Sequence, residues 1–223
     1  MKNFMFYADG YNKVEKKIKD FLNSQTDFLS PHTVSSTRAT GDAIQDLLAD
    51  NFRSILGERI QEYSADFARR AMADLAFSDK EGFYYVIDVK THRLDTHFNM
   101  PNLTSVERIA RFYENDKNYF VILEVAYNLV GNHVKVEKVH FVPIEFLSWD
   151  CLTIGALGWG QIQIANSNKI IITPQARKKW MIKLCDTLFE FYPTEIGKIK
   201  ERIDRFKKVK AYWLAKKVKN LDI

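Results

Sequence analysis

The spacing of hydrophobic residues changes twice along the chain. Up to about residue 72, apolar residues recur every three or four positions, which is typical of helices. Between residues 73 and 173 they gather in short runs separated by turn residues, which is typical of strands, and the helical spacing then returns. This order predicts an α/β fold in which a central mixed β-sheet is flanked by helices.

Helices are predicted where an apolar stripe follows a start signal. The polar stretch 30–40, which holds Pro31 and several serines and threonines, predicts a loop between the first two helices. Thr104 and Glu107 have the spacing of a capping box and predict a helix that interrupts the strand region. The predicted helices span residues 8–29, 41–56, 61–72, 104–115, 174–191 and 194–219.

Strands are predicted where β-branched and aromatic residues gather. The turn-like residues 78–82 predict that the first two strands form a hairpin. Glu124 interrupts an almost wholly apolar strand, so it needs a partner or an exposed position. Residues 91–102 are polar and irregular, and residues 155–160 form a glycine-rich loop. The predicted strands span residues 73–77, 83–90, 119–127, 134–142, 161–165 and 170–173.

The composition is typical of a water-soluble globular chain. Of the 223 residues, 46% are hydrophobic and 27% charged, which suits one domain with a sizeable core. The first residues lack the apolar run of a signal peptide, and no run is long enough to span a membrane. Cys151 and Cys185 have no partner pattern and are predicted to be reduced thiols. We therefore expect a cytoplasmic protein with no membrane association.

Positive charge is concentrated near the end of the sequence. The formal net charge is +5, but residues 177–219 contain 14 Lys and Arg against 5 Asp and Glu, a net charge of +9. The rest of the chain therefore carries −4 (+5 − 9 = −4). A basic segment can neutralise nucleic-acid phosphates, although a solvated amphipathic helix explains the same pattern.

Two aspartates and a lysine form the strongest candidate for a catalytic centre. Asp74 and Asp88 lie on the two strands of the predicted hairpin, and Lys90 shares a strand face with Asp88 because side chains two apart point the same way. Two carboxylates and a backbone carbonyl can hold Mg²⁺, and a lysine can orient an attacking water. A salt-bridged, exposed strand face is the alternative explanation. The five histidines are scattered without the spacing of metal ligands.

Four segments occur in the order and approximate spacing found in a known family. They are Ala73-Asp74-Leu75, Ile87-Asp88-Val89-Lys90-Thr91, Met100-Pro101-Asn102-Leu103 and Gly158-Trp159-Gly160-Gln161-Ile162-Gln163-Ile164. The chain thereby resembles the PD-(D/E)xK nucleases, and within them the type II restriction endonucleases of the HincII and EcoRV kind. The resemblance covers about residues 41–165. The chain departs from the family at Ala73, where the proline that names the superfamily is expected.

The resemblance implies a restriction-endonuclease-like fold and a role for each residue of the candidate centre. Asp74 and Asp88 would be catalytic ligands of Mg²⁺, for which Mn²⁺ would substitute. Val89 would lend its backbone carbonyl to the metal ion. Lys90 would position the attacking water.

The resemblance also divides the chain into parts of one endonuclease domain, 1–223. Residues 1–40 would form an N-terminal helix and loop that are a candidate dimerisation arm. Residues 41–173 would form the catalytic and recognition core, and residues 174–223 the basic C-terminal helices. The family often adds an acid from the helix before the catalytic strands, for which the candidates are Asp42 and Asp46.

Polar residues in these segments are candidates for contacting DNA. Arg93 and His92 follow the catalytic strand, where side chains can contact phosphate. Gln161 and Gln163 alternate with isoleucines, so both amides share one face, and glutamine can pair with adenine in the major groove. Ordinary loop or edge-strand polarity is the alternative explanation for each. The full candidate set is Thr91, His92, Arg93, Asn99, Asn102, Gln161 and Gln163.

The resemblance implies a type II restriction endonuclease that hydrolyses both strands of double-stranded DNA at a short palindromic site. Cleavage would leave 5′-phosphate and 3′-hydroxyl ends, and the likeness to HincII and EcoRV suggests blunt ends. A palindrome calls for a two-fold symmetric homodimer, and a companion DNA methyltransferase would protect a prokaryotic host. The alternatives are a repair or nicking nuclease of the same fold and a DNA-binding module without catalysis.

Overall fold

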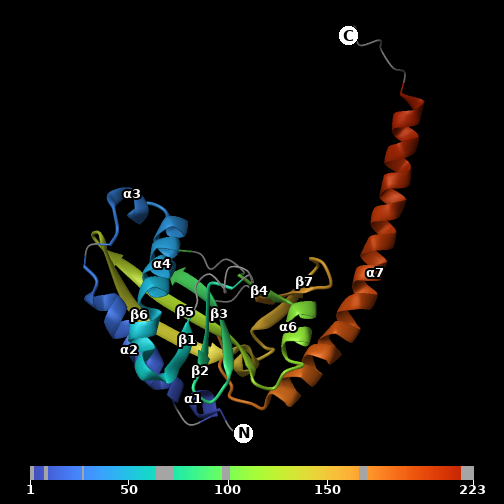
Figure 1. Ribbon diagram of the computed structural model, residues 1–223. Helices are drawn as coiled ribbons and strands as arrows, with labels where there is room; N and C mark the ends of the chain where they lie inside the picture. The colour runs from blue at the N-terminus through green and yellow to red at the C-terminus, as the bar shows by residue number, and fades with distance from the viewer. Residues whose placement is uncertain are drawn as a thin grey trace. The chain divides into compact units, whose positions relative to one another are not determined.

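The computed structural model describes residues 3–7, 10–26, 28–63, 73–96, 101–165 and 170–216. These residues form a five-stranded mixed sheet, a second three-stranded sheet and several helices (Figure 1). The α/β class and the mixed sheet are therefore as predicted. The chain divides into two units, Met1–Gln175 and Ala176–Ile223, which we describe separately. The assignment of all 223 residues to one endonuclease domain stays a prediction.

The larger sheet has the strand order β1-β2-β3-β5-β6. Its central pair, β3 and β5, is parallel, and every other neighbouring pair in this sheet is antiparallel. The hairpin of β2 and β3 is as predicted, and β3 runs three residues beyond its predicted end. The strands are β1 (Ile60–Tyr63), β2 (Leu75–Asp79), β3 (Tyr84–Arg93), β5 (Asn118–Val130) and β6 (His133–Pro143).

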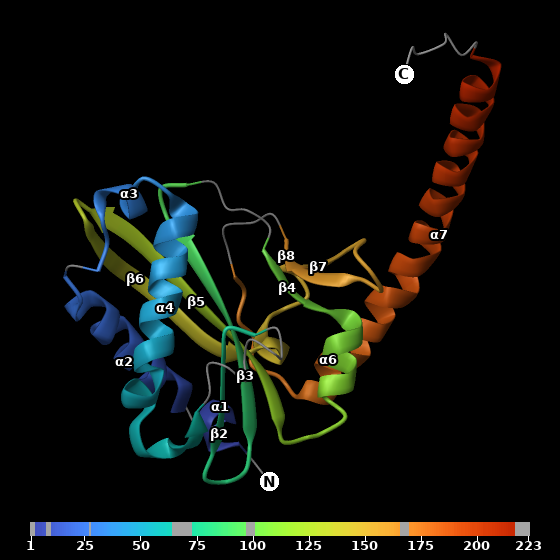
Figure 2. The ribbon, with the colours of Figure 1, turned by 45° about the horizontal axis from the view of Figure 1, so that its top comes forward.

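Two amphipathic helices, α2 (Gly10–Ser24) and α4 (Thr37–Leu56), lie on the same side of this sheet (Figure 2). In α4, Ile44, Leu48 and Phe52 recur at i, i+4 and i+8, and all three are fully buried. The Phe52 ring lies 6.0 Å from that of Phe77 and 6.1 Å from that of Phe141, on two different strands. This packing fixes α4 on the sheet, with the start of the helix near the end of β3.

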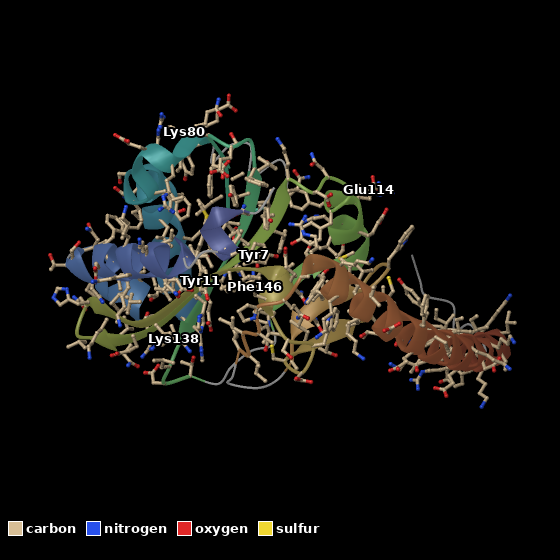
Figure 3. The ribbon with its side chains drawn as sticks, turned by 90° about the horizontal axis from the view of Figure 1, so that it is seen from below. Tyr7, Tyr11, Lys80, Glu114, Lys138 and Phe146 are labelled. Carbon is tan, nitrogen blue, oxygen red and sulfur yellow. The ribbon has the colours of Figure 1, made fainter. Side chains whose placement is uncertain are left out.

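The start of the chain places two tyrosines beside Phe146. Tyr7, in α1 (Phe4–Tyr7), and Tyr11, in α2, lie beside Phe146, with ring centroids 5.5 and 6.2 Å away (Figure 3). Phe146 itself belongs to the 3-10 turn η2 (Ile144–Phe146), which follows β6. The N-terminal segment is therefore packed into the core of its own unit.

Three predictions about the starts and extents of helices before residue 115 were wrong. The polar stretch 30–40 holds two helix starts, because Ser30 caps α3 (Pro31–Val34) and Ser36 caps α4. Residues 61–63, predicted as helix, belong to β1, and residues 64–72 lie outside the described residues. The helix α6 (Val106–Phe112) is capped by Ser105 rather than by Thr104.

β1 is extended because its residues pair with the edge of β2 and its end packs against α4. Glu62 and Tyr63 pair with Ser78 and Phe77. The Tyr63 ring stacks on Phe52, and its hydroxyl donates to the Ala49 carbonyl. The 3-10 turn η1 (Gly57–Arg59) links the two elements. Tertiary contacts thus override the weak helical spacing of this segment.

The smaller sheet has the strand order β4-β8-β7, and both pairs are antiparallel. Its strands are β4 (Asn102–Ser105), β7 (Leu152–Gly155) and β8 (Gln161–Ile164). β4 and β7 were not predicted. The strand predicted at 170–173 is wrong in extent, because in this stretch only Ile172 pairs, through an isolated bridge to Leu147.

The second unit is built on one long helix, α7 (Arg177–Ala215). We predicted two helices separated near Pro193, and this prediction was wrong. Proline has no N–H to donate to the carbonyl four residues earlier, but the next residue, Thr194, donates its hydroxyl to the Glu190 carbonyl at 3.3 Å. The neighbouring turns keep the helix continuous through Pro193. No helix in the described part of the chain is long and apolar enough to cross a membrane.

Candidate active site

The turn between β2 and β3 sets the geometry of the predicted catalytic residues. Asp79 Oδ1 accepts hydrogen bonds from the backbone N–H groups of Glu81 and Phe83, each at 3.0 Å. Gly82 has a φ of +78°, in the left-handed region that favours glycine. The chain therefore reverses tightly, and β2 returns along β3 to bring Asp74 beside Asp88.

Asp74 lies directly before β2 and is held by three hydrogen bonds. Its backbone N–H donates to the Ile87 carbonyl at 3.1 Å. Its carboxylate accepts from the Val89 backbone N–H at 2.6 Å through Oδ2, and from Gln45 Nε2 at 2.7 Å through Oδ1. The side chain thus bridges β3 and α4, and each carboxylate oxygen keeps a further lone pair for a ligand.

Asp88 and Lys90 share one face of β3, as predicted from their spacing. Lys90 Nζ donates to Asp88 Oδ1 at 2.8 Å, and the two side chains are 25% and 13% exposed respectively. Asp88 Oδ2 is buried and has no hydrogen-bond partner among the described residues. A buried carboxylate oxygen that is left unsatisfied is costly, so this atom is suited to bind a cation or a proton.

The electrostatics of Asp88 support the same interpretation. The pKa of its carboxyl is raised to about 7, chiefly by burial; the charge of Asp74 adds to this shift, whereas Lys90 and Arg108 oppose it. Asp74 and Asp88 are therefore close enough to repel each other when both are ionised. A divalent cation that contacts both carboxylates would relieve this repulsion.

The residues that could hold a metal ion are few. Among the described residues, no group of three or more His, Cys, Asp or Glu side chains is gathered as a metal-ligand cluster. A cation at Asp74 and Asp88 would therefore complete its coordination with a backbone carbonyl and water, as Mg²⁺ commonly does. The hard oxygen donors and the unsatisfied Asp88 Oδ2 fit such an ion.

The α4 residue that contacts Asp74 is neither of the predicted third acids. Asp42 is exposed and lies 4.0 Å from Arg38, and Asp46 is exposed as well. Gln45, which lies between Asp42 and Asp46, takes the place on the sheet-facing side of α4 and supplies an amide where an acid was expected. Helical spacing could have placed Gln45 on the face of α4 that meets the sheet, since it lies four residues after the buried Gly41 and three before the buried Leu48.

A cavity of about 280 Å³ opens beside Lys90 at the end of β3. Glu124 lines this cavity from β5, where it pairs in register with Lys90, and is only 7% exposed. Burial raises the pKa of Glu124 to about 7, an effect that Lys138 opposes. On the other side, His140 Nε2 lies 3.9 Å from Glu124 Oε2, and burial lowers the His140 pKa to about 4. The sequence pattern indicated that Glu124 needs a partner or an exposed position, but no functional role for it.

Two predicted DNA-reading residues, 61 positions apart, contact each other in the smaller sheet. Asn102 on β4 pairs in register with Gln163 on β8, and Gln163 Nε2 donates to Asn102 Oδ1 at 2.5 Å. Gln161 shares the outer face with Gln163, and the isoleucines between and after them are buried, as the alternation predicted. Gly155 on β7 leaves room for this arrangement, because a Cβ there would lie 2.6 Å from Gln163 Oε1.

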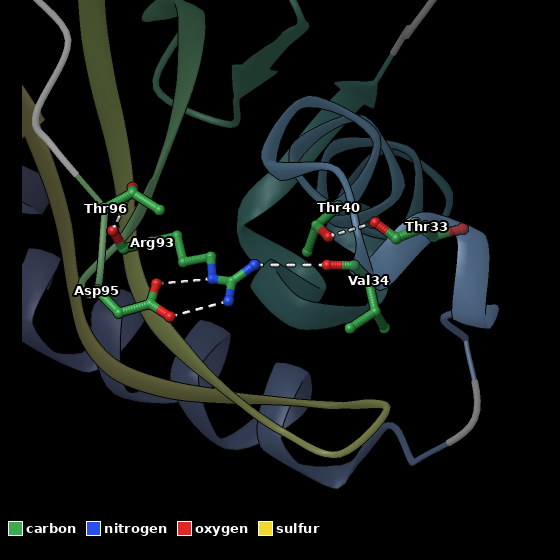
Figure 4. Close-up of polar contacts among 6 residues, drawn as sticks. All are labelled: Thr33, Val34, Thr40, Arg93, Asp95 and Thr96. Carbon is green, nitrogen blue, oxygen red and sulfur yellow. Dashed lines mark hydrogen bonds and ion pairs between the residues drawn. The ribbon is translucent and has the colours of Figure 1, made fainter.

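The remaining candidates lie around the end of β3. Arg93 forms two hydrogen bonds with Asp95, at 2.7 and 2.8 Å, and a weaker one with the Val34 carbonyl (Figure 4). A DNA phosphate would therefore compete with Asp95 for this guanidinium. Thr91 points toward α4, since a Cβ on Gly41 would lie 2.5 Å from Thr91 Oγ1.

His92 and Asn99 complete the predicted set. His92 lies on the same face of β3 as Asp88 and Lys90, because side chains two apart point the same way. Burial lowers the pKa of His92. It also lines the cavity beside Lys90. Asn99 lies outside the described residues. The structure thus brings His92 close to the candidate centre and places Asn102, Gln161 and Gln163 together on a separate sheet.

Comparison of the sequence with protein-family models and with curated proteins gives no match.

Proposed function

We propose that this chain is a magnesium-dependent endonuclease that cleaves double-stranded DNA. The observation that carries the proposal is the arrangement around Asp88: a second carboxylate, Asp74, lies beside it, Lys90 contacts one of its oxygens at 2.8 Å, and its other oxygen is buried without a partner in the described chain. Metal-assisted hydrolysis of a phosphodiester can use these three elements, namely oxygen ligands for a metal ion, a cationic side chain and a poorly solvated site.

Each residue has a defined task in this proposal. Asp74 and Asp88 would hold Mg²⁺ or Mn²⁺, with the Val89 carbonyl as a further ligand. The bound ion would supply Lewis-acid stabilisation of the charge that develops on the phosphate. Lys90, oriented by Asp88, would hold the attacking water by a hydrogen bond, and the proton that this water loses would pass to solvent. Gln45 is a positioning residue, because it fixes the Asp74 carboxylate.

The finer proposal is a type II restriction endonuclease of the restriction-endonuclease-like fold. Its support is the resemblance of four segments to the PD-(D/E)xK family, together with the contact between Asn102 and Gln163 from two of those segments. Amides that share a β-sheet face can present paired donors and acceptors to base edges. Such an enzyme would act as a homodimer on a palindrome, leave 5′-phosphate and 3′-hydroxyl ends, with blunt cleavage, and work beside a DNA methyltransferase in a prokaryotic cytoplasm.

The test is digestion of a supercoiled plasmid by the purified full chain, with Mg²⁺ or with EDTA. We expect discrete linear fragments with Mg²⁺ and none with EDTA. Asp88→Asn and Lys90→Ala should each lower cleavage by at least about a hundredfold, because each removes a group that acts in the transition state. Glu137→Gln, which changes a carboxylate of β6 outside the site, should cleave like the wild type.

Three outcomes distinguish the alternatives. Nicked circles without linear fragments would support a nicking or repair nuclease instead. DNA binding without cleavage under any metal would support a binding module. Cleavage that survives both Asp88→Asn and Lys90→Ala would show that the catalytic assignment is wrong.

A further inference from the structure

The helix α7 carries a regular apolar stripe. Its large apolar side chains, and one cysteine, alternate at spacings of three and four residues, which is the heptad pattern of a coiled coil. Lys210 interrupts the pattern once, one heptad after Ile203. The positions of the stripe are Ile182, Cys185, Phe189, Tyr192, Ile196, Ile199, Ile203, Phe206 and Trp213.

This stripe is exposed in the single chain. Phe189 is 73% exposed, and Ile196 and Phe206 are each 67% exposed. Side chains project from α7 along its length (Figure 3). By contrast, the apolar face of α2 is already buried within its own unit. A continuous row of large exposed apolar side chains is unusual for a monomer and indicates an interaction surface.

We propose that α7 pairs with the same helix of a second copy of this chain, as an antiparallel coiled coil in which Ile196 lies opposite Ile199 of the partner subunit. The second copy follows from the pattern, because a stripe with a seven-residue repeat is complementary to another helix with the same repeat. The inference concerns α7 alone and does not rest on nuclease activity, although a two-fold dimer is what a palindromic substrate requires.

The antiparallel register matches every apolar position. With Ile196 opposite Ile199 of the partner subunit, Phe189 lies opposite Phe206 of the partner subunit. Ile182 then faces Trp213 of the partner subunit at the two ends of the seam. The contact would extend over about 47 Å of helix, the rise of the residues from 182 to 213. In this register Lys210 faces Cys185 of the partner subunit at the edge of the seam.

The charges that flank the stripe favour the antiparallel orientation. It places the exposed Asp186 beside Lys207 of the partner subunit, which is an attractive pairing. A parallel pair would instead place Arg202 against Lys207 of the partner subunit, which is repulsive, and the buried Glu195 against Lys200 of the partner subunit. Glu195 would lie beside Arg202 of the partner subunit, but it is only 9% exposed and already accepts a hydrogen bond from Lys198 at 2.6 Å, so the orientation is argued from Asp186.

The oligomeric state of the full chain tests the pairing. We expect sedimentation at micromolar concentration to give twice the monomer mass of 26.1 kDa. The double variant Ile199→Asp/Ile203→Asp should weaken the dimer by at least about a hundredfold, because it places carboxylates in the seam. Tyr212→Asp changes an aromatic residue that is 61% exposed but lies outside the stripe, and it should leave the dimer intact.

A monomeric wild type would overturn the inference. A double variant that stays dimeric at wild-type affinity, with unchanged circular dichroism, would also overturn it, because the dimer contact would then lie elsewhere.

Thiol oxidation with diamide tests the orientation. In the antiparallel register the two Cys185 residues lie about 37 Å apart along the axis, so the wild type should form no disulfide-linked dimer. Lys210→Cys should form one in high yield, between Cys185 and the new thiol at position 210, and Cys185→Ser should abolish it. Rapid linkage of the wild type through Cys185 would indicate a parallel pair and overturn the proposed register.

Discussion

Two carboxyl groups on neighbouring strands of the larger sheet share one property, a pKa near neutrality. Asp88 on β3 and Glu124 on β5 both have a pKa raised to about 7, chiefly by burial. Asp88 has Lys90 as a close partner, whereas Glu124 has His140 at 3.9 Å, whose own pKa is lowered to about 4. Near pH 7 each carboxyl can change charge with a small change in surroundings, so both can respond to a cation or a phosphate.

Glu124→Gln should change the pH dependence of stability. The pKa of Glu124 lies above its ordinary value of 4.5, so the folded chain binds this proton more tightly than the unfolded chain. Ionisation of Glu124 therefore lowers the free energy of unfolding. This loss is absent below about pH 4.5, where Glu124 is protonated in both states, and grows until about pH 7, the pKa in the folded chain. The variant should therefore equal the wild type at pH 4 and exceed its free energy of unfolding by roughly 1–3 kcal/mol at pH 8.

Urea denaturation at the two pH values, without added metal, measures this difference. Glu137→Gln, whose pKa is lowered by Lys135, is the matched control and should show no such gain at pH 8. An equal stability difference for Glu124→Gln at both pH values would contradict the assignment of a raised pKa.

The three short strands of the smaller sheet act together as one element. Asn102 from β4 and Gln163 from β8 are linked by a hydrogen bond, and Gly155 on β7 leaves the space that the Gln163 amide fills. The orientation of both amides therefore depends on a third strand that carries neither of them. If this face contacts DNA, its specificity depends on the packing of the sheet as much as on the two polar residues.

Gly155→Ala should disturb this amide pair without unfolding the chain. The added Cβ would lie 2.6 Å from Gln163 Oε1, so the Gln163 side chain must move away from Asn102. We expect cleavage at the preferred sequence to fall by roughly tenfold, the effect of losing one base contact. The Mg²⁺ dependence should be unchanged, since Asp88 and Lys90 are untouched. Gly197→Ala, where a Cβ has open space, is the control, and equal cleavage by both variants would argue against a role for this face.

The elements that sequence patterns predict are the ones with strong local signals. β3, β5 and β6 are long and rich in apolar residues, and the spacing of Asp88 and Lys90 on β3 gave their common face. β4 and β7 have four residues each and depend on pairing with β8, so their own sequences carry little signal. The helix end predicted near Pro193 was wrong, because a helix can tolerate a single proline when the backbone hydrogen bonds of the flanking turns remain.

The residues of the candidate site that are close in sequence were predicted, whereas those that tertiary packing brings to it were missed. Asp74, Asp88 and Lys90 are close in sequence, and a hairpin suffices to bring them together. Gln45 and Glu124 come from α4 and β5, and their positions depend on how those elements pack against β3. Gln45 also could not be found with a motif that specifies acidic residues, because it carries an amide where the resemblance predicts an acid.

At the scale of the whole molecule, the candidate catalytic residues and the excess of positive charge belong to different units of the chain. The candidate catalytic residues and the smaller sheet belong to the first unit, whereas residues 177–219 carry a net charge of +9. On α7 the apolar stripe leaves many lysines and arginines on the outer faces of the proposed coiled coil. A dimer would therefore present two basic surfaces together with two candidate active sites, which suits a two-strand substrate.

Breaking the dimer should change the product of plasmid cleavage. An enzyme with one active site per subunit needs two subunits to cut both strands in one encounter. With Mg²⁺, Ile199→Asp/Ile203→Asp should accumulate nicked circles before linear DNA, whereas the wild type should give linear DNA directly. Time courses on agarose gels measure the ratio, with Tyr212→Asp as the control. Linear DNA formed by the double variant without a nicked intermediate would contradict this expectation.

The tight turn at Asp79 also has a consequence for the order of events during folding. Asp74 and Asp88 are joined by a hairpin whose ends are only 14 residues apart, so closing that loop costs little chain entropy. The parallel pairing of β3 with β5 must wait for the longer crossover through α6. The two acids should therefore meet early, before β5 pairs with β3, when the folding chain is still open to water and to metal ions.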